Sequence, residues 1–299
     1  MKKIRLAFYT ASGCSGCILS FFDLEEFFLS SERFSVVWAP MFTNSKLEDL
    51  EKIERIDLTF IEGSIRLSEH EEIVKILREK SEKVVALGTC AVFGGVPGLS
   101  NFYSDEEILS DVFDSDENAP KPRTLLDGKY ELTLPEFKDE MKRVEEVIEV
   151  DHFVPGCPPS KNQLLKIIDF DFEERWIVEK TSVCSVCPRK VEEIKVSAVK
   201  RAFEKDDGRC FLLQGILCFG PLTPGNCEAA CIKVNVPCRG CYGSFPNVRD
   251  FGAKFVDLIS SIAEKNIAEE LSRKYPSLAR VIYAYTLPAA IINKKVRKG

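Results

Sequence analysis

The distribution of its 12 cysteines constrains this chain of 299 residues more than any other feature. Eight of the 12 lie in one short stretch, between Cys184 and Cys241, where glycine and proline are also frequent. A small segment with so little continuous apolar sequence needs additional cross-links to fold. Cysteines that only filled a core would be scattered along the chain, so this crowding favours metal ligands.

The surroundings of these thiols point in the same direction. The N-terminal apolar run in MKKIRLAFYT is too short for a signal peptide, and no apolar run approaches the length of a membrane span. We therefore expect a cytoplasmic protein, in which disulfides are rare. The chain has only two histidines, His70 and His152, so a site for several metal ions must be almost entirely thiolate. Iron–sulfur clusters and cysteine-only zinc sites are the two chemistries that fit.

Composition excludes one large class of partners. The formal net charge is −6, and the sequence has no basic stripe interleaved with aromatic residues. A nucleic-acid-binding surface is therefore not expected. The 45% share of hydrophobic residues is typical of a globular chain, and the length suits one large or two ordinary domains.

The first 170 residues read as alternating strands and helices. Short apolar runs predict strands at 4–9, 36–39, 58–61, 83–87 and 152–154, and helical periodicity predicts helices at 17–29, 69–80 and 160–168. Continuous apolar strands that alternate with helices indicate a parallel sheet covered on both faces. The segment from 101 to 150 is acidic and reads as an irregular insertion.

Four cysteines follow three of these predicted strands. Cys14 and Cys17 follow the first strand, Cys90 follows the fourth in GTCAVFGG, and Cys157 follows the fifth in PGCPP. Loops at the carboxyl ends of parallel strands meet at one edge of the sheet, where ligands bind. We therefore expect these four thiols to converge.

The remaining 129 residues divide into a cysteine-rich part and a tail with one clear helix, at about 252–265. A zinc ribbon formed by Cys184, Cys187, Cys238 and Cys241 is an alternative to iron–sulfur clusters. Its two halves are further apart than in ordinary ribbons, and four more cysteines would be left over. Three sets of four ligands use every cysteine. The expected architecture is an α/β domain at 1–170 and a cysteine-rich domain with a helical tail at 171–299.

An ordered set of motifs carries a family resemblance over essentially the whole chain. GCSGC, GTCAVFGGVPGL, PGCPPS, VCSVCPRK, VPCRGCYG and TLPAAIINKK follow one another in this order. The chain resembles the small subunit of [NiFe] hydrogenases, and among these the archaeal methyl-viologen-reducing, coenzyme F420-non-reducing type associated with heterodisulfide reductase and methanogenesis.

This resemblance implies a flavodoxin-like first domain, a second domain with two clusters, and three [4Fe-4S] clusters in all. The proximal ligands would be Cys14, Cys17, Cys90 and Cys157, and the distal ligands Cys184, Cys187, Cys210 and Cys218. The medial ligands would be Cys227, Cys231, Cys238 and Cys241. Many relatives have an acidic residue within two positions after the first Cys-x-x-Cys pair, whereas Ile18 and Leu19 stand there in this chain.

The same resemblance implies the function. The chain would contain no nickel and no catalytic residue. It would conduct electrons from H2 oxidation at a large catalytic subunit to an acceptor subunit that carries an iron–sulfur cluster and is linked to heterodisulfide reductase. The small subunit of a deazaflavin-reducing hydrogenase or of a bidirectional NAD(P)-linked sulfhydrogenase, and a zinc-stabilised interaction module, stay open as alternatives.

Overall fold

The computed structural model describes residues 3–29, 32–113, 124–128, 130–169, 173–191, 195–201, 204, 206–264 and 266–293. Its centre is a five-stranded parallel sheet formed by β1 (Ile4–Thr10), β2 (Phe34–Trp38), β3 (Ile56–Glu62), β5 (Ser81–Leu87) and β9 (His152–Val154). The strand order is β2-β1-β3-β5-β9, which is the order of flavodoxin-like doubly wound sheets. All five predicted strands are therefore confirmed.

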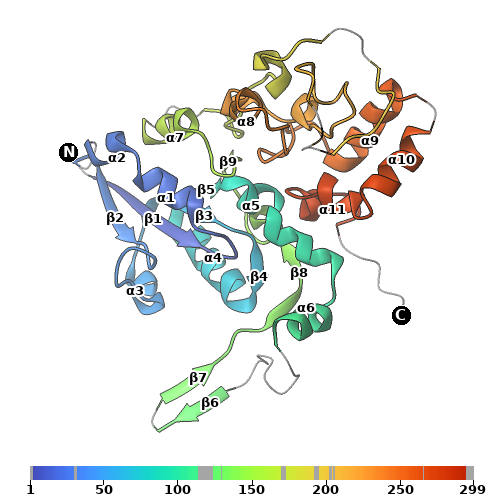
Figure 1. Ribbon diagram of the computed structural model, residues 1–299. Coiled ribbons are helices and arrows are strands. Elements are labelled where there is room, and N and C mark those ends of the chain that lie inside the picture. The colour runs from blue at the N-terminus through green and yellow to red at the C-terminus, as the bar shows by residue number, and fades with distance from the viewer. Residues whose placement is uncertain are drawn as a thin grey trace.

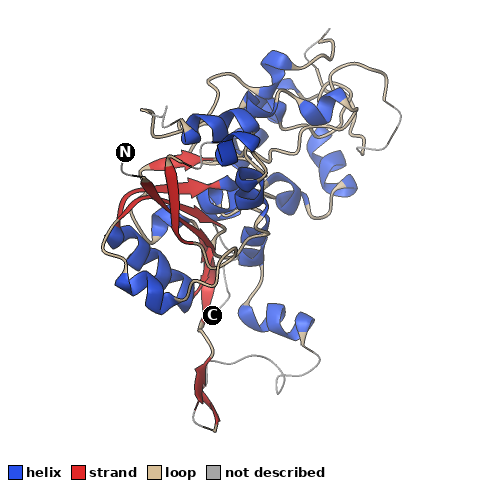
Figure 2. Cartoon of the chain, turned by 90° about the vertical axis from the view of Figure 1, so that its left-hand side faces the viewer, coloured by secondary structure: helices blue, strands red, loops and turns tan. Residues whose placement is uncertain are grey.

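Helices cover both faces of this sheet (Figures 1 and 2). On one face, α1 (Gly16–Phe22), α2 (Glu25–Leu29) and α7 (Lys161–Ile168) pack against Phe8 and Phe60 of the strands. On the other face, α3 (Leu47–Lys52), α4 (Ser68–Lys80) and α5 (Gly88–Phe93) pack against Ile61 and Val84. The single helix predicted at 17–29 is wrong in one respect, because the chain breaks it at Asp23 and Leu24.

The segment predicted to be an irregular insertion has more regular structure than expected. It contains α6 (Asp105–Val112), the paired strands β6 (Thr124–Asp127) and β7 (Tyr130–Thr133), and β8 (Phe137–Lys142). Strand β8 pairs with β4 (Ile65–Leu67), which attaches the segment to the edge of the first core. The β6–β7 pair projects away from the rest of the chain (Figure 1). Residues 114–123 lie outside the described part of the chain.

The cysteine-rich part has little regular structure. Up to Asp250 its described helical elements are short: η3 (Val183–Val186), η4 (Gly220–Leu222), η5 (Gly225–Cys227) and α8 (Ala230–Lys233). The tail adds α9 (Phe251–Ile262), α10 (Ile267–Lys274) and α11 (Leu278–Ile282). Its core combines apolar residues such as Phe219 and Phe255 with the buried thiols of Cys218 and Cys238. Among the described residues, no helix combines the length and the apolar character needed to cross a membrane.

Candidate metal centres

The structure brings together the four cysteines that follow the strands. Cys14 and Cys17 lie in the loop after β1 and at the start of α1, Cys90 lies in α5 directly after β5, and Cys157 follows β9. Their thiols are within electrostatic reach of one another. Burial raises the pKa of Cys90 to about 12, and the charges of Cys157 and Cys14 act in the same direction. The expected convergence at one edge of the sheet is therefore present.

Two glycines leave the space that these thiols need. A Cβ on Gly88 would lie 2.2 Å from the Sγ of Cys17, and a Cβ on Gly95 would lie 2.4 Å from the Sγ of Cys90. Both glycines also have positive φ angles, of +86° and +59°, which favour glycine over other residues. Side chains at these two positions would occupy the volume around the sulfur atoms.

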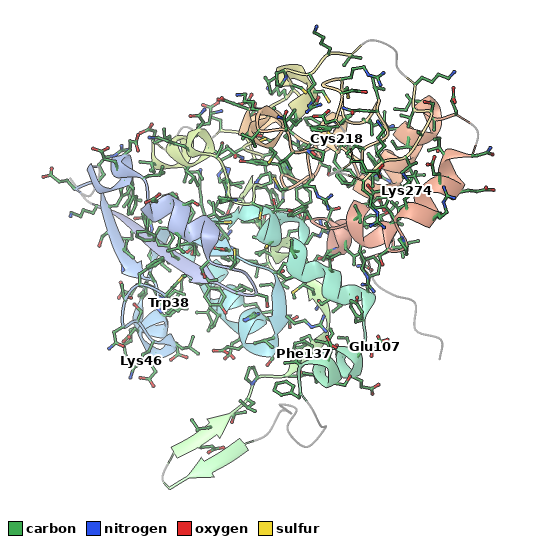
Figure 3. All side chains as sticks on the ribbon, in the orientation of Figure 1. Trp38, Lys46, Glu107, Phe137, Cys218 and Lys274 are labelled. Atoms are coloured by element: carbon green, nitrogen blue, oxygen red, sulfur yellow. The ribbon has the colours of Figure 1, made fainter. Side chains whose placement is uncertain are left out.

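A second set of four thiols lies in the cysteine-rich part. Although Cys184 is exposed in part, the partial burial of its thiol raises its pKa to about 12, and the charges of Cys218, Cys210 and Cys187 act in the same direction. The Sγ of Cys218 accepts hydrogen bonds from the backbone N–H groups of Gly220 and Cys238, although burial still raises its pKa to about 11. Figure 3 labels Cys218 inside this region. Backbone N–H groups aimed at sulfur are a usual feature of iron–sulfur sites.

The third set adjoins both of the others. Burial raises the pKa of Cys241 to about 12, and the charges of Cys227, Cys157 and Cys231 raise it further. Cys238 is within electrostatic reach of both Cys241 and Cys218, and its Sγ accepts the backbone N–H of Gly240. The third set is thus within electrostatic reach of the first set at Cys157 and of the second set at Cys218.

Clustered thiols of this kind suit a cationic inorganic group. At neutral pH, thiols whose pKa values lie near 11 or 12 stay protonated, whereas a bound metal deprotonates them outright. Within the described ranges, no three His, Cys, Asp or Glu side chains are arranged so as to hold a single metal ion. An iron–sulfur cubane is larger than one ion and spreads its ligands further apart. The donor set of thiolates and backbone N–H groups fits such clusters.

Known proteins resemble this chain along its full length. The family described as NADH ubiquinone oxidoreductase, 20 Kd subunit, matches residues 14–169. The iron-sulfur subunit of the F420-non-reducing hydrogenase of Archaeoglobus profundus is 39% identical, and the match covers 99% of both chains. The matching F420-non-reducing hydrogenase subunit of Methanothermobacter marburgensis is 33% identical over 99% of this chain and 98% of its own.

The chain belongs to the family of these F420-non-reducing hydrogenase subunits. It is therefore a subunit of an oxidoreductase, as the motifs predicted. Solved hydrogenase structures share its fold. The actinobacterial-type NiFe-hydrogenase from Ralstonia eutropha H16 has a TM-score of 0.52 at 18% identity, and the match covers 94% of this chain and 88% of its own. The [NiFeSe] hydrogenase from Desulfovibrio vulgaris Hildenborough also has a TM-score of 0.52, at 16% identity, and the match covers 83% of this chain and 96% of its own.

One buried acid at the first set of thiols was missed by the sequence analysis. Glu62 ends β3 and is 1% exposed, and its carboxylate accepts the backbone N–H of Ile18 at 2.9 Å. The N–H groups of Ser15 and Cys17 also donate to it, but burial raises the pKa of Glu62 above its ordinary value. A signal was present in the sequence, because an acid that ends an apolar strand directly before a glycine is unusual.

A hydrogen-bond bridge joins the two parts of the chain between their thiols. The hydroxyl of Thr89 donates to the carbonyl of Cys241 at 2.5 Å and accepts the backbone N–H of Gly156 at 2.9 Å. The Tyr242 hydroxyl donates to the carbonyl of Pro158 at 3.2 Å. The loops of the first and third sets are thus held side by side.

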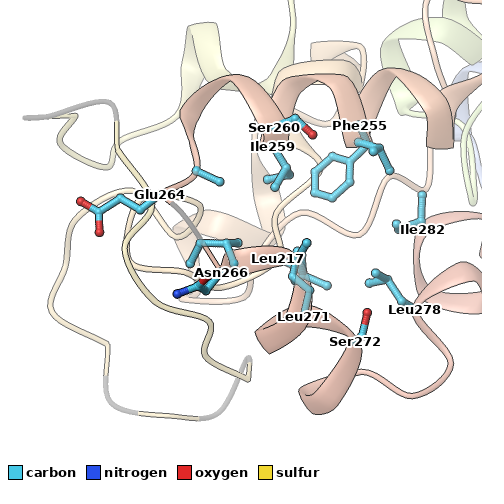
Figure 4. Close-up of a pocket in the computed structure, with 14 residues that line it drawn as sticks. Leu217, Phe255, Ile259, Ser260, Glu264, Asn266, Leu271, Ser272, Leu278 and Ile282 are labelled. Atoms are coloured by element: carbon cyan, nitrogen blue, oxygen red, sulfur yellow. The ribbon is translucent and has the colours of Figure 1, made fainter.

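An apolar cavity of about 320 Å³ is lined by Leu217, the residue before Cys218 of the second set (Figure 4). It is formed by α9, α10 and α11 together with Leu217, which directly precedes Cys218. Its walls are mainly apolar, with Phe255, Ile259 and Leu271 among them. No cysteine lines it, so it adds no ligand to the three sets.

Proposed function

We propose that this chain is the electron-transferring small subunit of a cytoplasmic [NiFe] hydrogenase and holds three [4Fe-4S] clusters. Cys14, Cys17, Cys90 and Cys157 would hold the proximal cluster. Cys227, Cys231, Cys238 and Cys241 would hold the medial cluster, and Cys184, Cys187, Cys210 and Cys218 the distal cluster. The proposed domain boundary, between residues 170 and 171, lies outside the described residues. The nickel site lies in a partner large subunit.

One observation carries this proposal. The three sets of thiols form a series. The Thr89 hydroxyl links the carbonyl of Cys241, in the third set, to the backbone N–H of Gly156, which directly precedes Cys157 of the first set. The backbone N–H of Phe219, which directly follows Cys218 of the second set, donates to the carbonyl of Cys238 at 3.0 Å. When bound, each cluster supplies one-electron redox chemistry, and three in series divide the two-electron oxidation of H2 into single steps. The chain's own contribution is to fix the spacing of the sets, donate hydrogen bonds to sulfur and limit the access of water.

The partner large subunit should cover the exposed apolar surface beside the first set. Leu19 is 51% exposed and Met41 is 42% exposed, and Phe42 packs on Phe22 with its ring centroid 4.3 Å away. The apolar residues of the GTCAVFGGVPGL motif, at positions 92, 93, 96 and 99, predict such a surface from sequence alone. That prediction is wrong for Val92 and Phe93, which are buried within this chain.

The acceptor should dock at the distal end of the series. Cys184 is exposed there, and Val186 and Val191 are exposed apolar side chains near it in the chain. We propose an acceptor subunit that carries an iron–sulfur cluster and is linked to heterodisulfide reductase. The match to F420-non-reducing subunits along the whole chain favours this acceptor over deazaflavin or NAD(P).

Metal analysis of the full chain purified anaerobically tests the proposal. We expect about 12 iron and 12 sulfide per chain, as three four-iron clusters require, and no nickel in the absence of the partner. Co-purification should then recover a large subunit that contains nickel and an acceptor chain. Stoichiometric zinc with little iron would overturn the proposal and favour a zinc-stabilised module.

A further inference from the structure

The side chain of Arg189 is buried beside the second set of thiols. The sequence places it next to Lys190 and two residues after Cys187, where it reads as an exposed charge for docking an acidic partner. The structure contradicts that reading, because the Arg189 side chain is 6% exposed. A buried guanidinium must find partners for its charge and its N–H groups.

Four contacts hold this guanidinium in place. It forms a two-pronged ion pair with Asp206, with Nη1 at 2.7 Å from Oδ1, and Arg189 holds the pKa of the Asp206 carboxyl well below its ordinary value. Nη1 also donates to the carbonyl of Arg209 at 2.8 Å, and Nη2 donates to Oδ1 of Asn235 at 3.1 Å. The guanidinium carbon lies 3.5 Å from the ring centroid of Phe211. Its orientation is therefore fixed by partners on several loops.

One N–H group is left over by these contacts. The Nε atom of Arg189 is buried and has no hydrogen-bond acceptor among the described residues. The guanidinium is within electrostatic reach of Cys187 and Cys210, two of the proposed distal ligands. A buried donor without an acceptor destabilises a protein, and such donors are rare in native structures. A ligand sulfur or a cluster sulfide between these cysteines would supply the missing acceptor.

We propose that Nε–H of Arg189 donates a hydrogen bond to a sulfur atom of the distal cluster and that this contact raises the cluster's reduction potential. The inference rests on the proposed function, since it requires a cluster at this set. Hydrogen bonds to sulfur and nearby positive charge both favour the reduced, more negative state. A raised potential at the distal end draws electrons toward the exit of the series.

Arg209 offers a matched control within the same chain. It directly precedes Cys210 and is therefore closer in sequence to a proposed ligand than Arg189 is. Its side chain pairs with Asp207 at 2.7 Å and is 46% exposed. Solvent screens such a charge far more than a buried one. Judged by sequence distance alone, Arg209 would have the larger effect on the reduction potential of the distal cluster. Judged by burial, Arg189 has the larger effect.

The experiment is a redox titration of the full complex followed by electron paramagnetic resonance, with the distal signal assigned by its loss in Cys184→Ser. At a fixed potential, Arg189→Gln should lower the reduced-to-oxidised ratio of the distal cluster about tenfold, which corresponds to about 59 mV for one electron. Arg189→Lys keeps a positive charge but loses Nε–H, so it should lower the ratio by a smaller factor of about three. Arg209→Gln should leave it unchanged.

Other results would contradict either the hydrogen bond from Arg189 or the proposed function itself. An unchanged ratio in Arg189→Lys would reject the hydrogen bond, and an unchanged ratio in Arg189→Gln would overturn the whole inference. If the variants lose the cluster, the unsubstituted complex labelled with ¹⁵N-arginine decides. A nitrogen hyperfine coupling on the distal signal supports the inference, and its absence overturns it. If the unsubstituted complex holds no iron–sulfur cluster in this chain beyond those of the other two sets, the distal cluster itself is absent and the proposed function fails.

Discussion

The two parts of this molecule carry the same kind of ligand but depend on it differently. In the sheet part, two apolar clusters on opposite faces of five hydrogen-bonded strands form the core, and Cys17 is the only proposed ligand among the described residues of either cluster. In the cysteine-rich part, Cys218 and Cys238 belong to the core itself, and Cys187, Cys210 and Cys227 pack against it. In the sheet part the core is therefore formed almost without thiols, whereas in the cysteine-rich part the thiols are members of the core.

Backbone hydrogen bonding shows the same contrast. The strands of the sheet pair in continuous parallel registers. From 173 to 250, strand-like contacts among the described residues are isolated bridges such as Ser182 with Pro224 and Lys190 with Arg209. A region with so few regular hydrogen bonds relies on other cross-links. If the proposed clusters are bound, a cluster would therefore add little to the fold of the sheet part but would be part of the core in the cysteine-rich part.

Removal of iron should produce the largest difference between the two parts. Anaerobic chelation should leave the five-stranded sheet folded but unfold the segment between Cys184 and Cys241, because metal-binding free energy is folding free energy where ligands form the core. Limited proteolysis followed by mass spectrometry measures this directly. Cleavage should concentrate in the cysteine-rich segment, while the segment from β1 to β9 stays protected. Equal protection of both parts in the iron-free chain would show that the cysteine-rich part does not depend on metal for its fold.

A side chain at Gly88 should remove the proximal cluster without unfolding the sheet part. Gly88→Ala places a Cβ 2.2 Å from the Sγ of Cys17 at a φ angle of +86°, so we expect loss of the proximal cluster, with about 4 fewer iron atoms per chain. The backbone strain alone costs about 1–3 kcal/mol. The matched control is Gly208→Ala, which has a φ of +84° but no atom within 4 Å of the new Cβ. Full iron content in Gly88→Ala would contradict the expected role of this space.

Cys231→Pro should have a smaller and more local effect. Cys231 is exposed and lies within electrostatic reach of Cys241. The substitution would leave three protein ligands at the medial cluster, so we expect about one iron atom to be lost and a three-iron cluster to form. Spectra of the oxidised variant and iron analysis measure the change. An unchanged four-iron signature with full iron content would remove Cys231 from the ligand set.

Thr89→Val should have the smallest effect. Thr89 lies at the interface between the sheet part and the cysteine-rich part. The substitution removes the hydroxyl that links Cys241 and Gly156, and we expect a loss of about 1 kcal/mol in stability. We also expect an altered magnetic interaction between the proximal and medial clusters. Thr59→Val is the control, since Thr59 is equally buried but bonds Ser81 inside the sheet. If both variants alter this magnetic interaction equally, the Thr89 bridge does not set the spacing of the proximal and medial clusters.

Much of the sheet part could be predicted from local sequence. Apolar runs located all five parallel strands, and periodicity located α4 and α7 within one residue of their observed starts. Pairings between distant segments could not be predicted in this way. Strand β4 has three residues and pairs with β8, whose partner residue Lys142 lies far along the chain from Ile65. Short strands of this kind have no periodic signal of their own.

The convergence of the four strand-end thiols was predictable from the sequence, but the residues that support the thiols were not. The spacing of the cysteines and the strand ends already indicated the proximal set, and the structure brings its members together. Glu62 and Arg189 were missed or misread because both are charged residues that usually face solvent. Their burial depends on partners at distant positions, Ile18 for Glu62 and Asp206 for Arg189.

The carboxylate of Glu62 has a consequence for biogenesis. Because it accepts the N–H groups of Ser15, Cys17 and Ile18, the loop that carries the first two thiols is shaped by the protein alone. Cys14 and Cys157 are exposed at the same edge, within reach of a delivery protein. In the cysteine-rich part, by contrast, thiols belong to the core itself, so we expect this part to fold only when its metal is bound. Cluster loading should begin at the sheet edge, and the other two centres should mature afterwards.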